Sequence, residues 1–243
     1  MSGDPHVVSI TYRLSLGDQV EFRNPPPVDI NMPDFAGRLA DGILTLEPKT
    51  HFPTVEDVRP LSDAFVRAWE IAAGLTYNWP AFRFAFDGAS IINASTNVVV
   101  STHTSFADTA TRFNLKVGGD RYPTPPGFYQ ITPEIEAIWR RYIGYLQRRE
   151  PLLTMAYFCL TLLEREPGGR HVAAKKHSIE IDVLNKLGGL TSTRGDQVTA
   201  RKMTARTTPL SSEEQRWVEA AIRAIIHHLT FDQTKTLRMA DIS

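Results

Sequence analysis

Residues 118–127, "GGDRYPTPPG", contain the densest run of glycine and proline in the chain. Glycine leaves the backbone flexible, and proline restricts φ and lacks an N–H donor, so neither residue favours a continuous helix or central strand. Three glycines and three prolines in this stretch therefore predict a domain boundary. With the boundary at residue 122, the N-terminal domain comprises residues 1–122 and the C-terminal domain comprises residues 123–243.

Before this boundary, short apolar alternations predict an antiparallel sheet. In residues 7–14, "VVSITYRL", every second residue from Val8 onward is apolar, and in residues 81–86, "AFRFAF", three phenylalanines lie two apart. A period of two is typical of a strand with one buried face. The other predicted strands are residues 19–22, 42–47, 97–102 and 113–117, with a hairpin at Gly17-Asp18 and turns at Asp41-Gly42, Asp87-Gly88 and Gly118-Gly119.

One helix is predicted within this first half. Residues 54–75, "TVEDVRPLSDAFVRAWEIAAGL", place apolar side chains at helical spacing. Pro60 suits the first turn of a helix and Gly74 suits its end. The apolar positions of this helix, which we expect to cover one face of the sheet, are Leu61, Phe65, Ala68, Trp69 and Ala72.

After the boundary, the pattern changes to helices. Thr132 and Pro133 suit the N-cap and first position of one helix, and residues 151–166 are apolar on nearly all sides, as expected of the central helix in a bundle. A third helix is predicted to run from about Ile179 to a stop at Gly188. A fourth begins at Ser211, which has capping-box spacing to Glu214, and continues to about Leu229. The sequence therefore predicts an α+β protein, an antiparallel sheet domain followed by a helical bundle.

The amino-acid composition and the single cysteine indicate the cellular location that we expect for the protein. Hydrophobic residues make up 42% of the chain and charged residues 22%, which is typical of a soluble globular protein. Cys159 is the single cysteine, so no disulfide can form within the chain and a reducing, cytoplasmic location is expected. Neither a signal peptide nor the ~18 apolar residues of a membrane span is present, so we expect no membrane segment.

The familiar cofactor and metal motifs are missing. The sequence contains no GxxxxGK[S/T] phosphate loop, no GxGxxG fingerprint, no cysteine cluster and no HExxH motif. His227 and His228 are adjacent on a predicted helix, so their side chains point about 100° apart and cannot share one metal-binding face. We therefore predict no metal site and no cofactor.

The net charge is zero, but the two halves carry opposite charges. Residues 1–120 contain 9 Lys and Arg against 14 Asp and Glu, whereas residues 121–243 contain 18 against 13. Residues 170–206 are the basic part of the second half, and such a surface can hold phosphates without reading base sequence. Nucleic acid, a partner protein, the acidic first half and a second copy of the chain all stay open as partners. The predicted partner-binding residues are Arg194, Arg201, Lys202 and Arg206.

Several stretches resemble a known group of proteins. "LQRREPLLTMAYFCLTLLE", "IDVLNKLGGLTSTRGDQVTARK" and "PLSSEEQRWVEAAIRAIIHHL" are similar to the helical half of uncharacterised bacterial proteins and, more remotely, to HEPN domains. "FVRAWEIAAGL", "FRFAFDGASII" and "LRMADIS" also resemble parts of such bacterial proteins. The resemblance covers about half of the chain and implies a HEPN-like helical domain at residues 123–243.

Many HEPN domains cleave RNA without a metal, using an arginine followed at a short spacing by a histidine. The resemblance therefore implies a ribonuclease as one function, and the candidate catalytic residues are Arg165, Arg170 and His171, which are expected in an accessible loop between helices. Histidine suits acid–base work because its pKa lies near neutrality. However, chance alone produces about two such spacings at this composition. The preferred interpretation is a non-catalytic cytoplasmic protein whose basic helical half binds a protein or nucleic-acid partner, with a metal-independent ribonuclease as the alternative.

Overall fold

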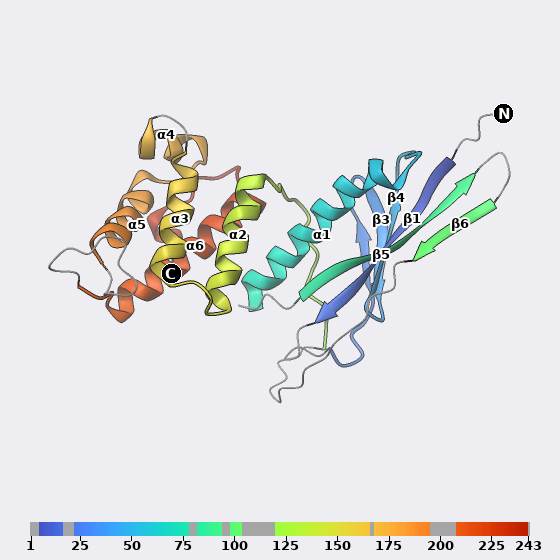
Figure 1. The fold of residues 1–243 in the computed structure, drawn as a ribbon, viewed down its shortest axis with the longest axis horizontal. Coiled ribbons are helices and arrows are strands. Elements are labelled where there is room, and N and C mark those ends of the chain that lie inside the picture. The colour runs from blue at the N-terminus through green and yellow to red at the C-terminus, as the bar shows by residue number, and fades with distance from the viewer. Residues whose placement is uncertain are drawn as a thin grey trace. The chain divides into compact units, whose positions relative to one another are not determined.

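The computed structural model describes residues 5–16, 22–77, 82–93, 98–103, 120–165, 168–194 and 208–242. The chain divides into two compact units, a sheet unit at Met1–Gly127 and a helical unit at Phe128–Ser243. Among the described residues, the sheet unit contains one helix and the helical unit contains the others (Figure 1). The predicted α+β class is therefore confirmed.

The sheet unit is built on a single antiparallel sheet. Its six strands follow the order β2-β3-β4-β1-β5-β6. Helix α1 (Val55–Tyr77) packs against β1 and β5 and covers one face of the sheet (Figure 1). The strands are β1 (Pro5–Leu16), β2 (Val28–Asn31), β3 (Phe35–Ala40), β4 (Ile43–Pro48), β5 (Phe82–Asn93) and β6 (Val98–His103).

Apolar side chains under α1 form the core of this unit. Tyr12 of β1 lies opposite Leu44 of β4, and both are buried. From the helix side, the fully buried ring of Trp69 contacts the rings of Phe82 and Phe84. The prediction that the phenylalanines of β5 share one face of the sheet is therefore confirmed.

Two irregularities change the predicted register of the strands. In the pairing of β1 with β5, Val8 has no partner on β5 and Asp87 has none on β1, so each is the extra residue of a β-bulge. The bulge at Val8 explains why Val7, and not Val8, is buried. The predicted turn at Asp87-Gly88 is wrong, because β5 continues through both residues.

Helix α1 is longer than its local residues predict. It begins after Thr54, whose Oγ1 accepts a hydrogen bond from the Asp57 N–H at 3.3 Å. Pro60 consequently lies inside the helix and not in its first turn, and Gly74 is a buried interior residue and not its end. Leu61 is 39% exposed, so it does not belong to the buried face. Packing of the other apolar residues against the sheet outweighs these two weak helix positions.

Helix α1 also provides a hydrogen-bond partner for a backbone N–H group on the open edge of β5. Strand β6 pairs only with Gly88–Asn93, so within the described residues the first half of β5 has a strand on one side only. The buried carboxylate of Glu70 accepts a hydrogen bond from the Phe84 N–H at 2.8 Å, and Arg67 holds its other oxygen. A backbone donor that would otherwise lack a partner is thereby satisfied.

The turn between β3 and β4 agrees with its sequence. Asp41 and Gly42 have φ of 50° and 75°, which is the conformation that a two-residue Asp-Gly hairpin requires, so this prediction is confirmed. Strands β2 and β3 were not predicted. The predicted hairpin at Gly17-Asp18, the strand at residues 113–117 and the turn at Gly118-Gly119 lie outside the described residues.

The helical unit contains five helices and a final 3-10 turn among its described residues. Helix α3 is almost entirely apolar and packs against α2, α5 and α6, which confirms its predicted central place. The Thr132 cap with Pro133 and the Ser211–Glu214 capping box are confirmed. The elements are α2 (Pro133–Leu146), α3 (Leu152–Leu163), α4 (Gly169–Lys176), α5 (Ile181–Thr193), α6 (Ser212–Phe231) and η1 (Met239–Asp241).

Helix α5 does not stop at its two glycines, contrary to the prediction. It runs through Gly188 and Gly189 to Thr193, whose hydroxyl donates to the Gly189 carbonyl at 2.8 Å. A Cβ atom at position 188 would lie 2.4 Å from Nη2 of Arg170, which reaches α5 from the unpredicted helix α4. Gly188 therefore has a packing role, because it leaves room for a guanidinium group. Gly189 faces open space.

This difference predicts opposite behaviour for two neighbouring substitutions. We expect Gly189→Ala to stabilise the helical unit by about 0.8 kcal/mol, because alanine lowers the entropy of the unfolded chain and favours the helix. Gly188→Ala should give a smaller gain or a loss, since Arg170 must move. Urea denaturation of both variants measures the difference, and in an Arg170→Ala background the two gains should become equal. Equal effects in the wild-type background would contradict the packing role.

Candidate functional site

The predicted partner-binding residue Arg194 is used inside the helical unit. It follows the end of α5, and its Nη2 and Nε donate to Oε1 of Glu214 at 2.7 and 3.0 Å. The hydrogen bond that Glu214 accepts from the Ser211 N–H, together with Arg194, lowers the pKa of the Glu214 carboxyl. Arg194 therefore links the end of α5 to the start of α6. The other three predicted residues, Arg201, Lys202 and Arg206, lie outside the described residues.

The candidate ribonuclease residues lie at one end of the helical bundle. Arg170 and His171 belong to helix α4 and not to a loop as predicted, because the chain re-enters a helix directly after Gly168. Arg170 donates from Nε to Glu164 at 2.6 Å and from Nη1 to Asn185 at 3.4 Å. Its guanidinium is thus held by neighbouring helices.

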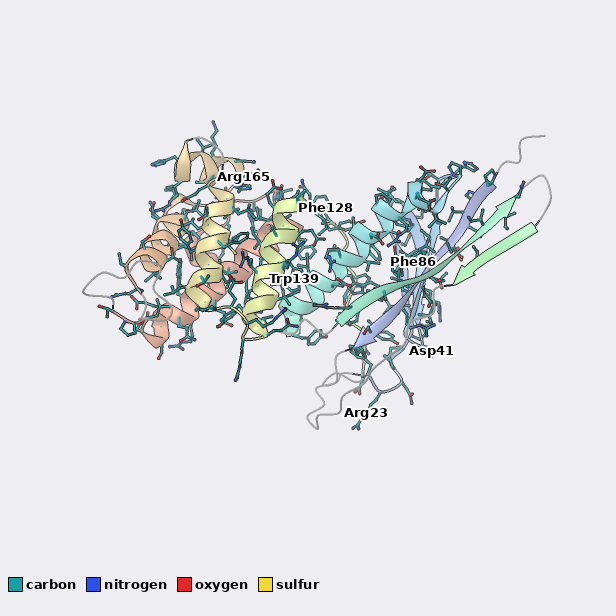
Figure 2. The ribbon with its side chains drawn as sticks, in the orientation of Figure 1. Arg23, Asp41, Phe86, Phe128, Trp139 and Arg165 are labelled. Atoms are coloured by element: carbon teal, nitrogen blue, oxygen red, sulfur yellow. The ribbon has the colours of Figure 1, made fainter. Side chains whose placement is uncertain are left out.

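Arg165 and His171 are both exposed. Arg165 lies at the end of α3, next to α4 (Figure 2). Within the described part of the chain, no hydrogen bond, ion pair or ring contact joins His171 to Arg165 or to Arg170. The structure therefore brings Arg170 to Glu164, and it does not bring an arginine to the His171 ring.

The two histidines of α6 have different surroundings. His228 is buried, and its Nε2 lies 2.8 Å from the carbonyl oxygen of His177. Because a carbonyl only accepts, Nε2 of His228 carries the proton. His227 lies at the surface, where its ring packs against Phe231. The part of the ring that is shielded from water lowers the pKa of His227. In the described residues, no group of three or more His, Cys, Asp or Glu side chains could hold a metal ion.

Three buried hydroxyl and thiol groups of the described residues have a raised pKa. Burial raises the pKa of the Cys159 thiol, which is fully covered on α3, and raises the pKa of Tyr142 to about 12. In the sheet unit, burial also raises the pKa of Tyr12, whose hydroxyl donates to Asp63 and contacts Ser62, both at 2.7 Å. These groups stay protonated, and Tyr12 fastens β1 to α1.

A cluster of arginines lies on the second half of α2 and on the turn that follows it. One of its arginines, Arg141, is fixed between two helices, since its guanidinium lies 4.3 Å from the ring of Phe158 on α3 and its Nη1 donates to Glu150 at 3.0 Å. Arg141 and the other three arginines are all exposed. We call these residues of α2 and of the turn to α3 the arginine cluster: Arg140, Arg141, Arg148 and Arg149.

Arg148 has an unusual backbone conformation. Its φ is 57°, in the left-handed region, and the N–H groups of Arg148 and Arg149 donate to the carbonyls of Tyr145 and Gly144 at 2.8 and 2.9 Å. These two bonds form the C-terminal cap of α2. In such a cap, the residue that occupies the position of Arg148 is usually glycine. A side chain there costs about 1 kcal/mol relative to glycine. The chain therefore carries an exposed cation where folding favours a residue without a side chain.

Positive charge also gathers where α2 begins. Glu134, in the first turn of α2, has a lowered pKa because it accepts a hydrogen bond from its own backbone N–H and one from Thr132, and because Lys176 and Arg165 lie near it. The start of α2, the end of α3 and the end of α4 therefore meet at this end of the bundle. The conformation of Arg148 is not visible in the sequence.

In the part of the chain that the structure describes, each helix is too short or too polar to span a bilayer. Compared with family models, with curated proteins and with solved structures, the chain has no match.

Proposed function

We propose that the protein is a non-catalytic, cytoplasmic interaction protein whose helical unit binds nucleic acid through the arginine cluster. The observation that carries this proposal is Arg148, an exposed cation at a helix end that favours glycine. Strained backbone positions that retain a side chain are concentrated at binding sites, where the side chain has a use other than folding. The neighbouring exposed arginines, Arg140 and Arg149, give the same surface further charge.

The chemistry of the cluster suits phosphate groups. All four cations are arginines, whose planar guanidinium groups donate paired hydrogen bonds to phosphate oxygens. Contacts of this kind give affinity without base sequence, and they depend steeply on salt. Arg141 is already oriented by Phe158 and Glu150, so its position is fixed before a partner binds.

One substitution separates stability from binding. We expect Arg148→Gly to raise the stability of the helical unit by about 1 kcal/mol, because glycine adopts positive φ without strain. The same change should weaken nucleic-acid binding and reduce the slope of log K against log salt by about one, as expected for one lost phosphate contact. Thermal denaturation and a mobility-shift titration at several salt concentrations measure the two effects.

The control for this test is Lys186→Ala on α5. Lys186 is exposed, and its Nζ lies 4.2 Å from the centre of the Trp217 ring. The substitution therefore removes one positive charge, as Arg148→Gly does, but from a different helix. Its loss should leave binding almost unchanged. Wild-type protein that fails to bind any nucleic acid at low salt would refute the proposed function, and an Arg148→Gly variant with full affinity would remove Arg148 from it.

The mixtures of protein and nucleic acid used in these titrations also test the ribonuclease alternative. Labelled RNA should stay intact in them, because Arg170 is engaged by Glu164 and no arginine contacts His171 within the described residues. Cleavage that His171→Ala abolishes would establish the enzyme in place of the binding protein. Cleavage that survives this substitution would exclude His171 as the catalytic histidine.

A further inference from the structure

The turn between β3 and β4 combines a reactive pair of residues with an exposed position. The chain contains two Asp-Gly steps, Asp41-Gly42 and Asp87-Gly88, and no Asn-Gly step. At such a step the glycine nitrogen can attack the carboxyl group of the preceding aspartate, because glycine has no Cβ atom to obstruct the approach. Asp41 is exposed, and within the described residues no hydrogen bond or ion pair restrains its carboxylate. The group that would be attacked is therefore available.

The nitrogen of Gly42, by contrast, is held in place. Its N–H donates a hydrogen bond to the Tyr122 hydroxyl at 3.1 Å, and the Gly42 carbonyl accepts one from the Leu14 N–H at 2.7 Å. Tyr122 is itself fixed, because it is only 8% exposed and its ring packs against Phe22. The peptide groups on both sides of Gly42 are thus anchored, one to Tyr122 and the other to β1.

The attack requires the hydrogen bond to Tyr122 to break. The Gly42 nitrogen must lose its proton when it bonds to Cγ of Asp41, and the peptide group between the two residues must rotate to bring these atoms together. Both changes take the N–H away from the hydroxyl. A hydroxyl that accepts this N–H therefore stabilises the unreacted turn and not the arrangement that reacts.

The second Asp-Gly step has different surroundings and provides an internal comparison. The carboxylate of Asp87 pairs with Arg13 at 3.3 Å, and the Asp87 side chain is only 13% exposed. This step lies inside β5, where β1 pairs on both sides of it. At Asp87-Gly88 the carboxylate itself is held, whereas at Asp41-Gly42 the nitrogen is held.

We propose that Asp41-Gly42 is a site of spontaneous isomerisation to isoaspartate, and that the Tyr122 hydroxyl limits its rate. In the first step the Gly42 nitrogen bonds to Cγ of Asp41, the nitrogen loses its proton, and one carboxyl oxygen leaves as water. In the second step water opens the cyclic imide at either of its two carbonyls. The backbone then runs either through the original peptide bond or through the former side chain of Asp41.

The isoaspartate form changes the hairpin. It adds one methylene group to the backbone of a turn whose two residues have φ of 50° and 75°. A longer backbone does not fit this two-residue turn, so the pairing of Ala40 with Ile43 beside it should be lost first. The Tyr122 hydroxyl therefore protects the end of the β3–β4 pairing.

The test compares the wild-type full chain with Tyr122→Phe and Tyr77→Phe during incubation at neutral pH. Phenylalanine at position 122 keeps a ring against Phe22 and removes the hydroxyl that accepts the Gly42 N–H. Tyr77→Phe is the matched control, because Tyr77 is an exposed tyrosine at the end of α1. The same proteins incubated in urea give the rate of each Asp-Gly step without the folded structure.

Peptide mapping measures the two steps separately. Trypsin releases Asp41 in the peptide of residues 39–49 and Asp87 in the peptide of residues 84–112. Mass spectrometry with electron-transfer fragmentation then distinguishes isoaspartate from aspartate at each position. We expect isoaspartate at Asp41 to form about two- to tenfold faster in Tyr122→Phe than in wild type, which is the factor that one neutral hydrogen bond provides. Asp87 should react more slowly than Asp41 in each folded protein and at a similar rate in urea.

The other results would overturn the proposal. Equal rates at Asp41 in wild type and Tyr122→Phe, or the same acceleration in Tyr77→Phe, would remove the role of Tyr122. An equal acceleration at Asp87 in Tyr122→Phe would mean that the substitution acts by unfolding the sheet unit, which also removes that role. Absence of isoaspartate at Asp41 in folded Tyr122→Phe, or a faster reaction at Asp87, would reject Asp41-Gly42 as the site.

Discussion

Gly37→Ala is expected to destabilise the sheet unit by about 3 kcal/mol. Gly37 lies in β3 opposite Leu46 of β4, and a Cβ atom there would lie 2.3 Å from the Thr45 carbonyl oxygen and 2.9 Å from the Leu46 side chain. The first of these atoms belongs to the backbone, so it cannot turn away as the end of a long side chain can. The strands must separate, and that movement disturbs the pairing of both β3 and β4.

Urea denaturation followed by amide hydrogen exchange measures this loss, because exchange reports on the strands separately from the helices. Gly127→Ala is the matched control in the same unit, since nothing lies within 4 Å of the added atom. Its effect should stay within about 0.5 kcal/mol. A small effect of Gly37→Ala would mean that β3 and β4 are further apart than the structure places them.

Trp69→Ala should have the largest effect of a core substitution, about 4 kcal/mol. The ring is fully buried on α1, where it contacts Phe65, Phe82 and Phe84. Its removal leaves a cavity between the helix and the sheet, because the surrounding rings can close the space only in part. Protection of the α1 and β5 amides against hydrogen exchange should fall by the corresponding factor, whereas that of the helical unit should not change.

Trp69→Phe distinguishes the contribution of ring packing from that of the indole N–H group. The indole N–H donates to the Pro123 carbonyl at 3.1 Å, and phenylalanine keeps most of the apolar contact without this bond. We expect a loss of about 1–2 kcal/mol, smaller than that of alanine. If both substitutions cost the same, the hydrogen bond to Pro123 and not the packing would dominate.

The sequence revealed the elements whose patterns are strong and local. A period of two marked β1 and β5, short apolar runs marked β4 and β6, and capping residues marked the starts of α2 and α6. Strand β2 has only four residues, and β3 contains Gly37 at its centre, which weakens the apolar alternation. In β3 the glycine is required by the close approach of β4, and this contact is not visible in a single strand.

Two other predictions based on glycine, the turn at Asp87-Gly88 and the helix stop at Gly188, were wrong for a related reason. The Asp87-Gly88 pair is identical in type to the Asp41-Gly42 turn, yet it forms a bulge inside β5 because β1 pairs on both sides of it. Gly188 continues α5 because Arg170 fills the space beside it. In both cases a contact with a distant segment decides between two conformations that the local sequence allows equally.

The candidate site was less accessible to prediction than the fold. Charge density drew attention to residues 170–206, but Arg170 and Arg194 there are paired with Glu164 and Glu214. Composition cannot distinguish a cation held by a carboxylate from an exposed one. The positive φ of Arg148 became apparent only in the structure.

The bond between Glu70 and the Phe84 N–H also bears on the behaviour of the protein in concentrated solution. An open strand edge can pair with the same edge of another molecule and begin the growth of an aggregate. Glu70 occupies the donor at the centre of the edge of β5 and places a carboxylate beside it, so an approaching strand would have to displace a buried charge held by Arg67. Helix α1 therefore hinders strand pairing at this part of the β5 edge as well as covering one face of the sheet.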